Sequence, residues 1–413
     1  IQDVMPDTTQ KIYIVGAGIS GLIAAKTLEE KGYAPVILEA TDSPGGRVKT
    51  DNVSGVVLDH GFQVLLTAYP KAKKHLDYQA LRLKNFEPGA LIFSKGKAHR
   101  IGDPLRDLGS LLPTILAPVG NWSDKWKIFT LSRALKQKTI EEIFATPEQT
   151  TREYLKAYGF SDKIIRSFFK PFFSGIFLEE ELRTSSRMFE FVFKMFSEGY
   201  AALPVAGIGA IPQQLAASLK TTQIQFQHAV RKAEPGKITL ENGQTLPTDA
   251  TLITVPIDGQ TGTLNPGTID WKHCDNLYFT VPERTFSEGI IGLVAEEASL
   301  VNNLYFPFGQ AMQGHPLLSV TIVKDHGLDP DTLCQRVRQD LKTYCNIDAG
   351  ELVRHYHIKK ALPDIRDVRM MPADAVQTPQ GIFLAGDYLL SGSLNAAMAS
   401  GEVAAVALAE ELD

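Results

Sequence analysis

The sequence predicts an α/β protein in which a parallel-sheet domain, assembled from distant segments, carries an inserted domain of mixed or antiparallel sheet plus helices. Three observations support this prediction. Residues 11–38 read as a short apolar strand, a glycine-rich turn, a helix and a second strand. Residues 382–411 read as another short apolar strand followed by an alanine-rich helix. Strand patterns at 224–255 lie between these ends. Long stretches with a different pattern of apolar and polar residues separate them from both ends.

The length of 413 residues is too great for one compact core and favours two or three domains. A hydrophobic content of 44% and a charged content of 22% are ordinary for a globular protein. The net charge of −5 provides no general basic field, so nucleic acid is not an expected partner. The chain has few cysteines, namely Cys274, Cys334 and Cys345. Their small number argues against a disulfide framework and fits a reducing compartment, and their spacing predicts no metal site.

We expect a cytoplasmic protein without a transmembrane segment. No run approaches the roughly 20 apolar residues of a membrane span. Residues 1–10 lack the basic-then-apolar order of a signal peptide. The basic and apolar residues of 122–138 are compatible with peripheral contact with a membrane, but the acidic Glu141 and Glu142 that follow favour a solvated helix.

The glycine-rich turn is a G-x-G-x-x-G motif in a βαβ context, which predicts a Rossmann-like unit that holds the ADP half of a dinucleotide. Its residues are Gly16, Ala17, Gly18, Ile19, Ser20 and Gly21. The first glycine permits the tight turn, the second lets the backbone approach a pyrophosphate, and the third allows close packing of helix on strand. Free N–H groups and the positive end of the helix at 19–31 would face the phosphates.

The second strand of this unit, at 34–38, ends at Glu39, which is followed by Ala40. A carboxylate at this point can accept hydrogen bonds from both ribose hydroxyls and would repel a 2′-phosphate, which disfavours NADP. The plainer interpretation is a glycine turn without a ligand. The coincidence of three glycines with the acidic residue argues against it.

The pattern of residues changes in the middle of the chain. Helical patterns dominate from 67 to 204, with many phenylalanines between Ser167 and Tyr200. A helix is predicted at 208–220, strands at 224–230, 237–240 and 250–255, a β-rich region at 268–323 and an amphipathic helix at 331–344. These patterns divide the chain into a nucleotide-binding domain of residues 1–66, 205–256 and 365–413 and a substrate domain of residues 67–204 and 257–364.

Further motifs accompany the glycine turn. Gly45, Gly46 and Arg47 make a plausible second pyrophosphate clamp with the arginine as its cation. Together with 16–21, Glu39, the Ala385–Gly386–Asp387 run and the small residues of 395–401, they resemble the flavin superfamily of amine oxidases, protoporphyrinogen oxidases and phytoene desaturases. The resemblance covers about a third of the chain, chiefly its two ends, and implies FAD in a domain of the glutathione-reductase type.

The resemblance also implies roles for individual residues. Glu39 would bind the adenosine ribose, Arg47 would lie by the pyrophosphate and the flavin, and Val230 would contact adenine. Asp387, after Gly386, would touch the ribitol or pyrophosphate. The residues implied at the isoalloxazine ring are Gly61, Phe62 and Gln63 beside it and Leu394, Asn395 and Ala397 at its pyrimidine edge.

The C-terminal segment has a physical basis of its own. Its small residues let the start of a helix come close to a flat ring, and the helix dipole there favours the negative charge that develops on a reduced flavin. The plainer interpretation is an amphipathic helix packed on the sheet, which the adjoining Gly386 and Asp387 make less attractive. Because no cysteine lies near this segment, we expect FAD to be bound non-covalently.

The sequence does not identify catalytic residues. Amine oxidases of this superfamily often carry a lysine that holds a water at flavin N5, and Lys272 and Lys324 are candidates by location alone. Tyr388 is placed to flank the flavin. The phenylalanine-rich stretch is either an apolar tunnel for a lipid-like substrate or, as we favour, a helical core. For His355 and His357, ordinary hydrogen-bonded or exposed histidines are favoured over a catalytic base.

The predicted function is that of an FAD-dependent oxidoreductase of the oxidase, dehydrogenase or desaturase type, which transfers hydride from a hydrophobic small molecule to flavin N5. Oxygen, a quinone or another acceptor would reoxidise the flavin. One alternative is a redox-neutral, flavin-dependent isomerase. Another is a binding protein without catalysis, like the escort proteins of prenylated GTPases, although the presence of Glu39, Arg47 and Asp387 argues against a lost cofactor site.

Overall fold

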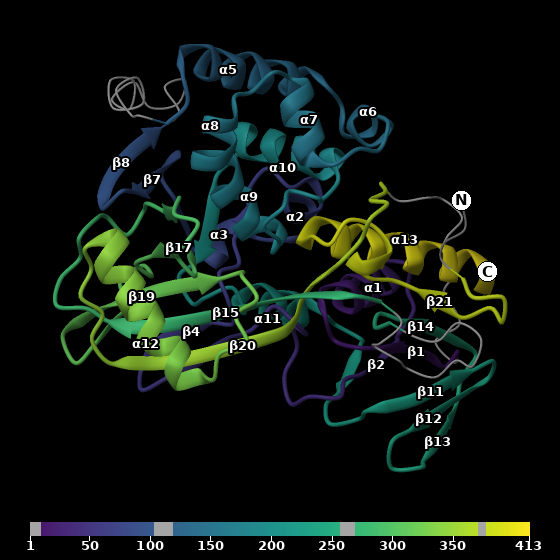
Figure 1. Ribbon diagram of the computed structural model, residues 1–413. Helices are drawn as coiled ribbons and strands as arrows, with labels where there is room; N and C mark the ends of the chain where they lie inside the picture. The colour runs from purple at the N-terminus through teal and green to yellow at the C-terminus, as the bar shows by residue number, and fades with distance from the viewer. Residues whose placement is uncertain (1–9, 103–118, 257–268, 371–376) are drawn as a thin grey trace.

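The computed structural model describes residues 10–102, 119–256, 269–370 and 377–413. Two large sheets lie side by side, and a group of helices stands over the space between them (Figure 1). Strands β1, β2 and β14 of the first sheet and β15, β19 and β20 of the second are labelled there. The mixed α/β character predicted from the sequence is therefore confirmed.

The first sheet is five-stranded, and all its neighbouring strands run parallel. Its strands come from the N-terminal, central and C-terminal parts of the chain. In spatial order they are β10 (Gln223–Gln225), β2 (Val36–Leu38), β1 (Ile12–Val15), β14 (Ala250–Ile253) and β21 (Phe383–Leu384).

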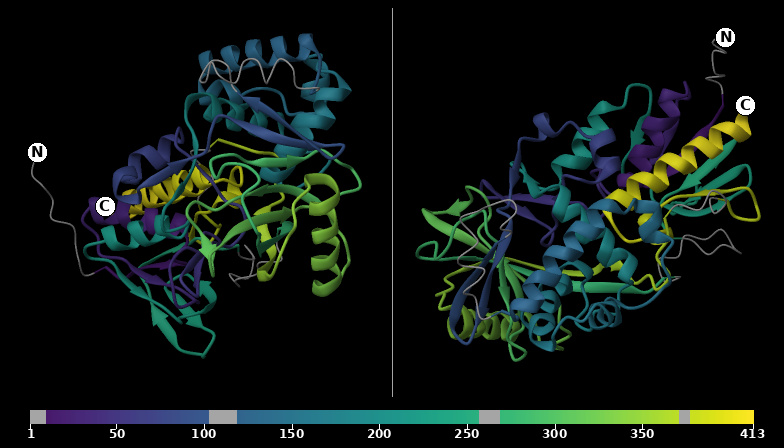
Figure 2. Two further views of the ribbon diagram at one scale, coloured as in Figure 1. Left: turned by 90° about the vertical axis from the view of Figure 1, so that its left-hand side faces the viewer. Right: turned by 90° about the horizontal axis from the view of Figure 1, so that it is seen from above.

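The two faces of this sheet are covered differently. Helices α1 (Ile19–Glu30), α11 (Ala210–Ser218) and α13 (Leu394–Leu412) pack on one face, with Leu22, Ile14 and Leu408 fully buried among them. The other face packs against an antiparallel three-stranded sheet of β11 (Val230–Glu234), β12 (Lys237–Leu240) and β13 (Thr245–Pro247). Helices α1 and α13 run alongside each other in every view (Figure 1, Figure 2).

The second sheet has eight strands and is mixed: β16 and β7 are parallel, whereas its other pairs are antiparallel. In spatial order its strands are β20 (Leu352–Pro363), β15 (Trp271–Thr280), β19 (His315–Ile322), β17 (Val301–Tyr305), β16 (Gly292–Val294), β7 (Gly89–Ser94) and β8 (Lys97–Gly102), with β18 (Ala311–Met312) beside β19.

Side chains on alternate positions of this sheet face opposite ways. Leu277, Val320 and Ile322 pack on one face against α12 (Pro330–Asp340) and the π-helical turn η4 (Leu341–Cys345) that continues it. On β15, Tyr278 points to the other face and donates a hydrogen bond from its hydroxyl to the carbonyl oxygen of Asp59 (2.9 Å).

The helical group occupies residues 122–198, with a core of phenylalanines. Its elements are α5 (Trp122–Gln137), α6 (Ile140–Phe144), α7 (Thr151–Ala157), α8 (Asp162–Ile164), η2 (Ile165–Phe169), α9 (Lys170–Phe177) and α10 (Ser186–Glu198). Helix α5 buries Leu131 and Leu135 but exposes 68% of Trp122 and 66% of Trp126. Among the residues that the structure describes, no helix is both long and apolar enough to cross a bilayer.

Smaller elements complete the fold. They are the hairpin β3 (Thr50–Val53) and β4 (Val56–Asp59), the sheet of β5 (Leu65–Leu66), β9 (Ala201–Pro204) and β6 (Leu83–Asn85), the helices α2 (Pro70–His75) and α3 (Tyr78–Leu81), and the 3-10 turn η5 (Asp387–Leu389).

One expectation about the elements is wrong. The strand predicted at 224–230 is two strands, β10 and β11, because Gln227 adopts a left-handed conformation (φ 58°) and turns the chain between them. In the described part of residues 67–204 helices dominate, as predicted, but the region also contains strands. It contributes β7 and β8 to the large sheet, where pairing with β16 rather than local sequence pattern decides their conformation.

An ion-pair cluster fastens α2 to α13. The carboxylate of Glu402 accepts hydrogen bonds from Lys71 (2.9 Å) and Lys74 (2.5 Å), and its Oε2 lies 3.0 Å from Nε2 of His75. Burial alone would raise the pKa of Glu402, but the hydrogen bonds from these neighbours lower it to about 2.

We expect Glu402→Gln to lower the free energy of unfolding by about 1–2 kcal/mol at pH 7, because the partly exposed cluster is screened by solvent. The contribution is fully present above the pKa of the unfolded carboxyl and is lost as the pH falls toward 2. Urea unfolding at pH 7, 5 and 3 should therefore show the difference from the wild type shrinking. The exposed Glu410→Gln on the same helix is the control, and a pH-independent difference would contradict the ion-pair account.

Candidate functional site

One cavity of about 720 Å³ extends from the glycine turn after β1 to the phenylalanine-rich helices. Residues predicted from separate parts of the sequence meet around it. Those that line it are Gly16, Gly18, Ile19, Ser20, Glu39, Gly45, Gly46, Arg47, Gly61, Phe62, Gln63, Gly386, Asp387, Leu394 and Ala397.

The remaining predicted residues lie outside this lining. Ala17 donates its N–H to Oε2 of Glu39 (2.7 Å), and Asn395 Oδ1 accepts the N–H of Lys71 (3.0 Å). Val230 packs in the core on the other side of the sheet. Gly21 and Ala40 also do not line the cavity.

The turn after β1 leaves room for a ligand at the start of α1. Gly18 is the N-cap residue of α1, and no side chain caps the helix there. A Cβ atom built on Gly18 would meet no protein atom within 4 Å. The second glycine pair lies against this turn, because Gly45 donates its N–H to the carbonyl oxygen of Ala17 (2.9 Å). The uncapped N–H groups and the adjoining space suit an anionic group.

Glu39 is held rigidly at the end of β2. Besides Ala17, its carboxylate accepts both the N–H (2.9 Å) and the hydroxyl (2.8 Å) of Thr41. The carbonyl oxygen of Glu39 accepts the N–H of His228 (2.8 Å), from the turn that follows β10. Only 7% of the residue is exposed. A fixed carboxylate with remaining acceptor capacity is suited to hold sugar hydroxyls.

Arg47 joins the N-terminal and C-terminal motifs across the cavity. Its Nη2 donates to Oδ1 of Asp387, and Nη1 lies 3.4 Å from the carbonyl oxygen of Ala361. The guanidinium lies over the ring of Trp271, 5.2 Å from its centroid. An arginine fixed by a carboxylate and an aromatic face provides a positioned positive charge in the cavity.

The C-terminal segment places the start of α13 at the same cavity. Gly386 donates its N–H to Oγ of Ser400 (2.8 Å), which fixes the turn before the helix. Ser393 caps α13 by accepting the N–H of Ala396 (3.1 Å). Leu394 and Ala397 then line the cavity at the positive end of the helix dipole.

Buried hydrogen bonds position the segment that contains Gly61. Asp59, at the end of β4, accepts the hydroxyl of Thr50 (2.6 Å) and the N–H of Ile208 (2.9 Å). Burial raises the pKa of Asp59 to about 6, although both hydrogen bonds oppose the rise. Gln63 then reaches back and donates to the carbonyl oxygen of Arg47 (2.9 Å).

The structure separates the two candidate lysines. Lys272 lines the cavity, with Nζ 3.2 Å from Oγ1 of Thr184 and 3.5 Å from Oδ1 of Asp364. Burial lowers the pKa of Lys272, and Asp364 opposes that shift. Lys324 lies elsewhere and donates to the carbonyl oxygens of Glu297 (2.5 Å) and Ser299 (2.8 Å). The interpretation of Lys324 as a residue of this cavity is therefore wrong.

The phenylalanine-rich stretch is both core and cavity wall. Fully buried rings of the helical core include Phe169, Phe173 and Phe189. Other apolar side chains of α9 and α10 line the far end of the cavity; they are Phe172, Ile176, Phe177, Met188, Val192 and Phe196. This stretch therefore contributes both to the helical core and to the lining of the cavity.

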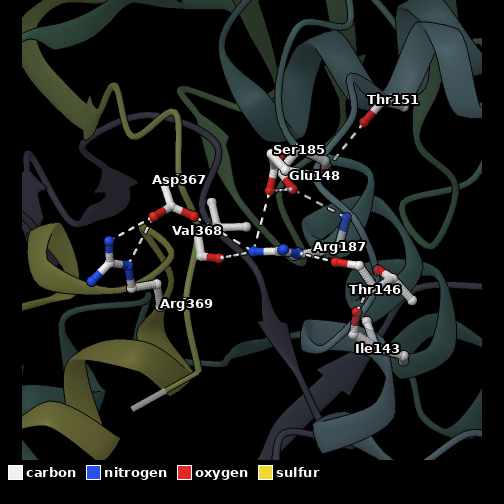
Figure 3. A network of polar contacts seen from close by, with 9 residues as sticks. All are labelled: Ile143, Thr146, Glu148, Thr151, Ser185, Arg187, Asp367, Val368 and Arg369. Atoms are coloured by element: carbon white, nitrogen blue, oxygen red, sulfur yellow. Dashed lines mark hydrogen bonds and ion pairs between the residues drawn. The ribbon is translucent and has the colours of Figure 1, made fainter. Parts of the chain in front are cut away.

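Arg187 ties the helical group to the segment around Val368 (Figure 3). Its guanidinium donates to the carbonyl oxygens of Thr146 (2.8 Å) and Val368 (3.2 Å) and lies near the carboxylates of Glu148 (3.4 Å) and Asp367 (3.5 Å). Val368 is buried and lines the cavity. Arg187 thus positions part of the cavity wall.

The two histidines are partners of a buried carboxylate, as favoured from the sequence. His355 Nε2 (2.5 Å) and His357 Nδ1 (3.0 Å) both lie against Oδ1 of Asp275, and His326 contacts Oδ2 (3.2 Å). Burial alone would raise the pKa of Asp275, but these hydrogen bonds lower it to about 2. None of the three histidines lines the cavity.

Several lining residues were not predicted from the sequence. They come from strand ends and from the segment after β14, and include Thr254, Val255, Trp271, Ile358, Lys360 and Leu362. They belong to no motif. Thr254 and Val255 reach the cavity at the end of β14, and the packing of β15 and β20 beside the first sheet brings the others there.

Comparison with known proteins agrees with this geometry. The model of the family described as flavin containing amine oxidoreductase matches residues 19–409. Protoporphyrinogen oxidase 2, chloroplastic/mitochondrial, of Arabidopsis thaliana is 26% identical over 168 residues, which are 40% of this chain. The matched segment spans only 32% of that relative's length.

Solved structures show the same fold over almost the whole chain. Putrescine oxidase bound to putrescine is 17% identical, with a TM-score of 0.69, 97% of this chain covered and 99% of the other. The CLA-producing fatty acid isomerase from P. acnes is 16% identical, with a TM-score of 0.69 and coverages of 98% and 99%.

We expect Gly18→Asp to abolish flavin binding without unfolding the protein. The new side chain has space in the protein itself, but it places bulk and negative charge where an anionic group would bind. Flavin absorbance of the purified protein measures the effect, and circular dichroism verifies the fold. Ala80→Asp, which adds the same charge at an exposed site, is the control. Normal flavin content in Gly18→Asp would refute this binding site.

Proposed function

The chain belongs to the flavin-containing amine oxidoreductases, and we propose that it is an FAD-dependent oxidoreductase that oxidises a hydrophobic small molecule. One observation carries the proposal. The same cavity reaches from the uncapped glycine turn and the fixed carboxylate of Glu39 at one end to an apolar chamber at the other. Cofactor sites in enzymes commonly have this form, with few polar groups placed in a largely apolar hollow.

The residues around the cavity fit FAD. The uncapped start of α1 and the open space at Gly18 suit its pyrophosphate, and Glu39 suits the adenosine ribose. Arg47, the segment at Gly61 and the start of α13 would hold the flavin half. Burial raises the pKa of Cys274, the cysteine in this lining, to about 12, so its thiol is a poor nucleophile. This supports non-covalent binding.

The arrangement of the first sheet, with helices on one face and an antiparallel meander on the other, supports the glutathione-reductase type of FAD-binding domain. We keep the division into an FAD-binding domain of 1–66, 205–256 and 365–413 and a substrate domain of 67–204 and 257–364. Residues 1–9, 103–118, 257–268 and 371–376 of these ranges lie outside the described residues.

The substrate would occupy the apolar end of the cavity. Aromatic and aliphatic side chains from α9 and α10 form one wall, and Ile291, Leu293 and Ile365 extend the apolar lining. Such a chamber favours apolar over charged substrates, because a buried charge without a partner is costly. This supports a hydrophobic molecule, the class that would include polyenes and porphyrins.

When bound, FAD would supply the redox chemistry for transfer of hydride from a substrate carbon to flavin N5. The chain orients the substrate and excludes water from the cavity. Lys272 supplies a fixed polar group, since Thr184 and Asp364 hold its Nζ at the edge of the apolar lining. We propose that Lys272, rather than Lys324, takes the place of the superfamily's water-holding lysine, because only Lys272 of the two lines the cavity. Arg47 and the start of α13 place positive potential where negative charge would develop.

The two alternatives make different predictions. A redox-neutral isomerase would act only after the flavin is reduced and would show no net flavin turnover. One solved structure of similar fold is that of a CLA-producing fatty acid isomerase, and for this reason we keep the isomerase as an alternative. A binding protein of the escort type would need no cofactor, which the intact set of Glu39, Arg47 and Asp387 disfavours. Oxygen and a quinone both stay as proposed electron acceptors.

We expect the purified protein to show a flavin spectrum and to bleach under anaerobic conditions with one class among amines, porphyrinogens and carotenoids. A protein that lacks flavin and takes up no added FAD would refute the proposal. Isomerisation that requires prior reduction would select the first alternative.

With the substrate identified in this way, we expect Lys272→Met to slow anaerobic flavin reduction by roughly ten- to a hundredfold, because the fixed amine is lost. Lys359→Met, at an exposed position of β20, is the control. Stopped-flow absorbance measures the rate. Equal rates in both variants would remove Lys272 from the mechanism.

A further inference from the structure

A second hollow, of about 820 Å³, lies apart from the cofactor cavity. It is enclosed by the β7–β8 hairpin, by the continuous helix of α8, η2 and α9, and by the segment at 294–301. Its size is in the range of small-molecule sites. The described cationic residues that line it are Lys95, Lys97, Lys163, Arg166, Lys170 and Lys324, and its acidic residues are Glu180, Glu296 and Glu297.

The acidic residues are held near Lys95 and Lys324 and leave the other cations without partners. Glu296 accepts the backbone N–H of Lys95, and Glu180 lies 3.7 Å from Nζ of Lys324. In the described part of the chain, no hydrogen bond or ion pair involves the side chains of Lys97, Lys163, Arg166 or Lys170. The positive charge of this cluster is local, because the chain as a whole carries a net charge of −5.

The helical wall presents these cations on one face. Lys163, Arg166 and Lys170 are spaced three and four residues apart, and Ser174 follows after four more, which places all four along one side of the helix. The π-helical turn η2 interrupts this helix at Ile165–Phe169. π-Helical turns are rare in proteins, and those that occur are often found at functional sites.

Ser174 provides an independent sign of a ligand. Only 1% of the residue is exposed, and its Oγ has no hydrogen-bond partner among the described residues. It lines the hollow beside Lys170. A buried hydroxyl without a partner costs free energy, and a ligand that accepts or donates a hydrogen bond there removes that cost.

We propose that this hollow is a binding site for a phosphate group carried by a small soluble molecule. A phosphate has enough acceptor oxygens for a guanidinium, several ammonium groups and a hydroxyl at once. Ser174 lies in the buried wall of the hollow, so the bound group must enter it, which favours a small molecule over a flat membrane surface.

Helix α9 connects this site to the cofactor cavity. Lys170 and Ser174 face the hollow, whereas Phe172, Gly175 and Ile176 of the same helix line the cavity. Gly175 packs closely on β17, because a Cβ built on it would lie 2.8 Å from Nδ2 of Asn302. A ligand that contacts Lys170 and Ser174 would therefore touch the same helix that lines the cofactor cavity.

The test uses FAD-loaded protein, in which pyrophosphate cannot take the place of the cofactor. Titration calorimetry with inorganic phosphate and with pyrophosphate should show binding. The double variant Arg166→Gln/Lys170→Gln should weaken it by roughly tenfold or more, because charge-assisted hydrogen bonds are lost. The charge-matched Lys31→Gln/Lys84→Gln, at exposed positions elsewhere, should bind like the wild type. Flavin absorbance and thermal unfolding verify that each variant is folded.

Ser174→Ala keeps the proposal falsifiable. It removes an unpartnered hydroxyl, so it should not destabilise the fold. We expect it to weaken pyrophosphate binding several-fold. The site is refuted by absence of binding of both probes, by equal affinity in the double variant, or by equal affinity in Ser174→Ala. Binding to phosphatidylglycerol vesicles that requires Arg166 and Lys170, with no pyrophosphate binding, would also refute it and assign the cluster to a membrane surface.

Discussion

The close approach of α1 to β1 and to α13 is the constraint on which the rest of the structure depends. A Cβ on Gly21 would lie 2.0 Å from the carbonyl oxygen of Gly16, and one on Gly401 would lie 2.2 Å from that of Ser20. Neither position therefore tolerates a side chain without separation of the backbones. The hydroxyl of Ser20 donates to the carbonyl oxygen of Ala397 (2.9 Å) and fixes the helices at this distance. The two ends of the chain thus meet at one point of the sheet.

This approach places two helix N-termini and a fixed arginine around one cavity. Helix α1 begins at the uncapped Gly18, and α13 begins after Ser393. Each contributes the positive end of a dipole, and Arg47 adds a full charge that Asp387 holds in place. Glu39 and Asp387, both less than a tenth exposed, balance this potential. This distribution of charge supports the proposed binding of a ligand with anionic groups at one end and a ring that gains negative charge at the other.

The second sheet and the helical group supply what the first sheet lacks. They bring Lys272, Trp271 and the apolar faces of α9 and α10 to the open side of the cavity. Arg187 fastens this part to the segment around Val368. Helix α9 also borders the basic hollow on its other side. One helix thus contributes to the substrate chamber and to a charged surface, which relates the two sites physically.

The sequence by itself determined the parallel-sheet unit, the glycine turn, Glu39, Arg47 and the segment at Asp387, because each depends on local geometry that only certain residues allow. It also determined that phenylalanines would build a helical core. Tertiary structure alone decided which lysine faces the cavity, that β7 and β8 join the large sheet, and which faces of α9 and α10 line the chamber. Those outcomes depend on contacts between residues far apart in the chain, and no local pattern of residues encodes them.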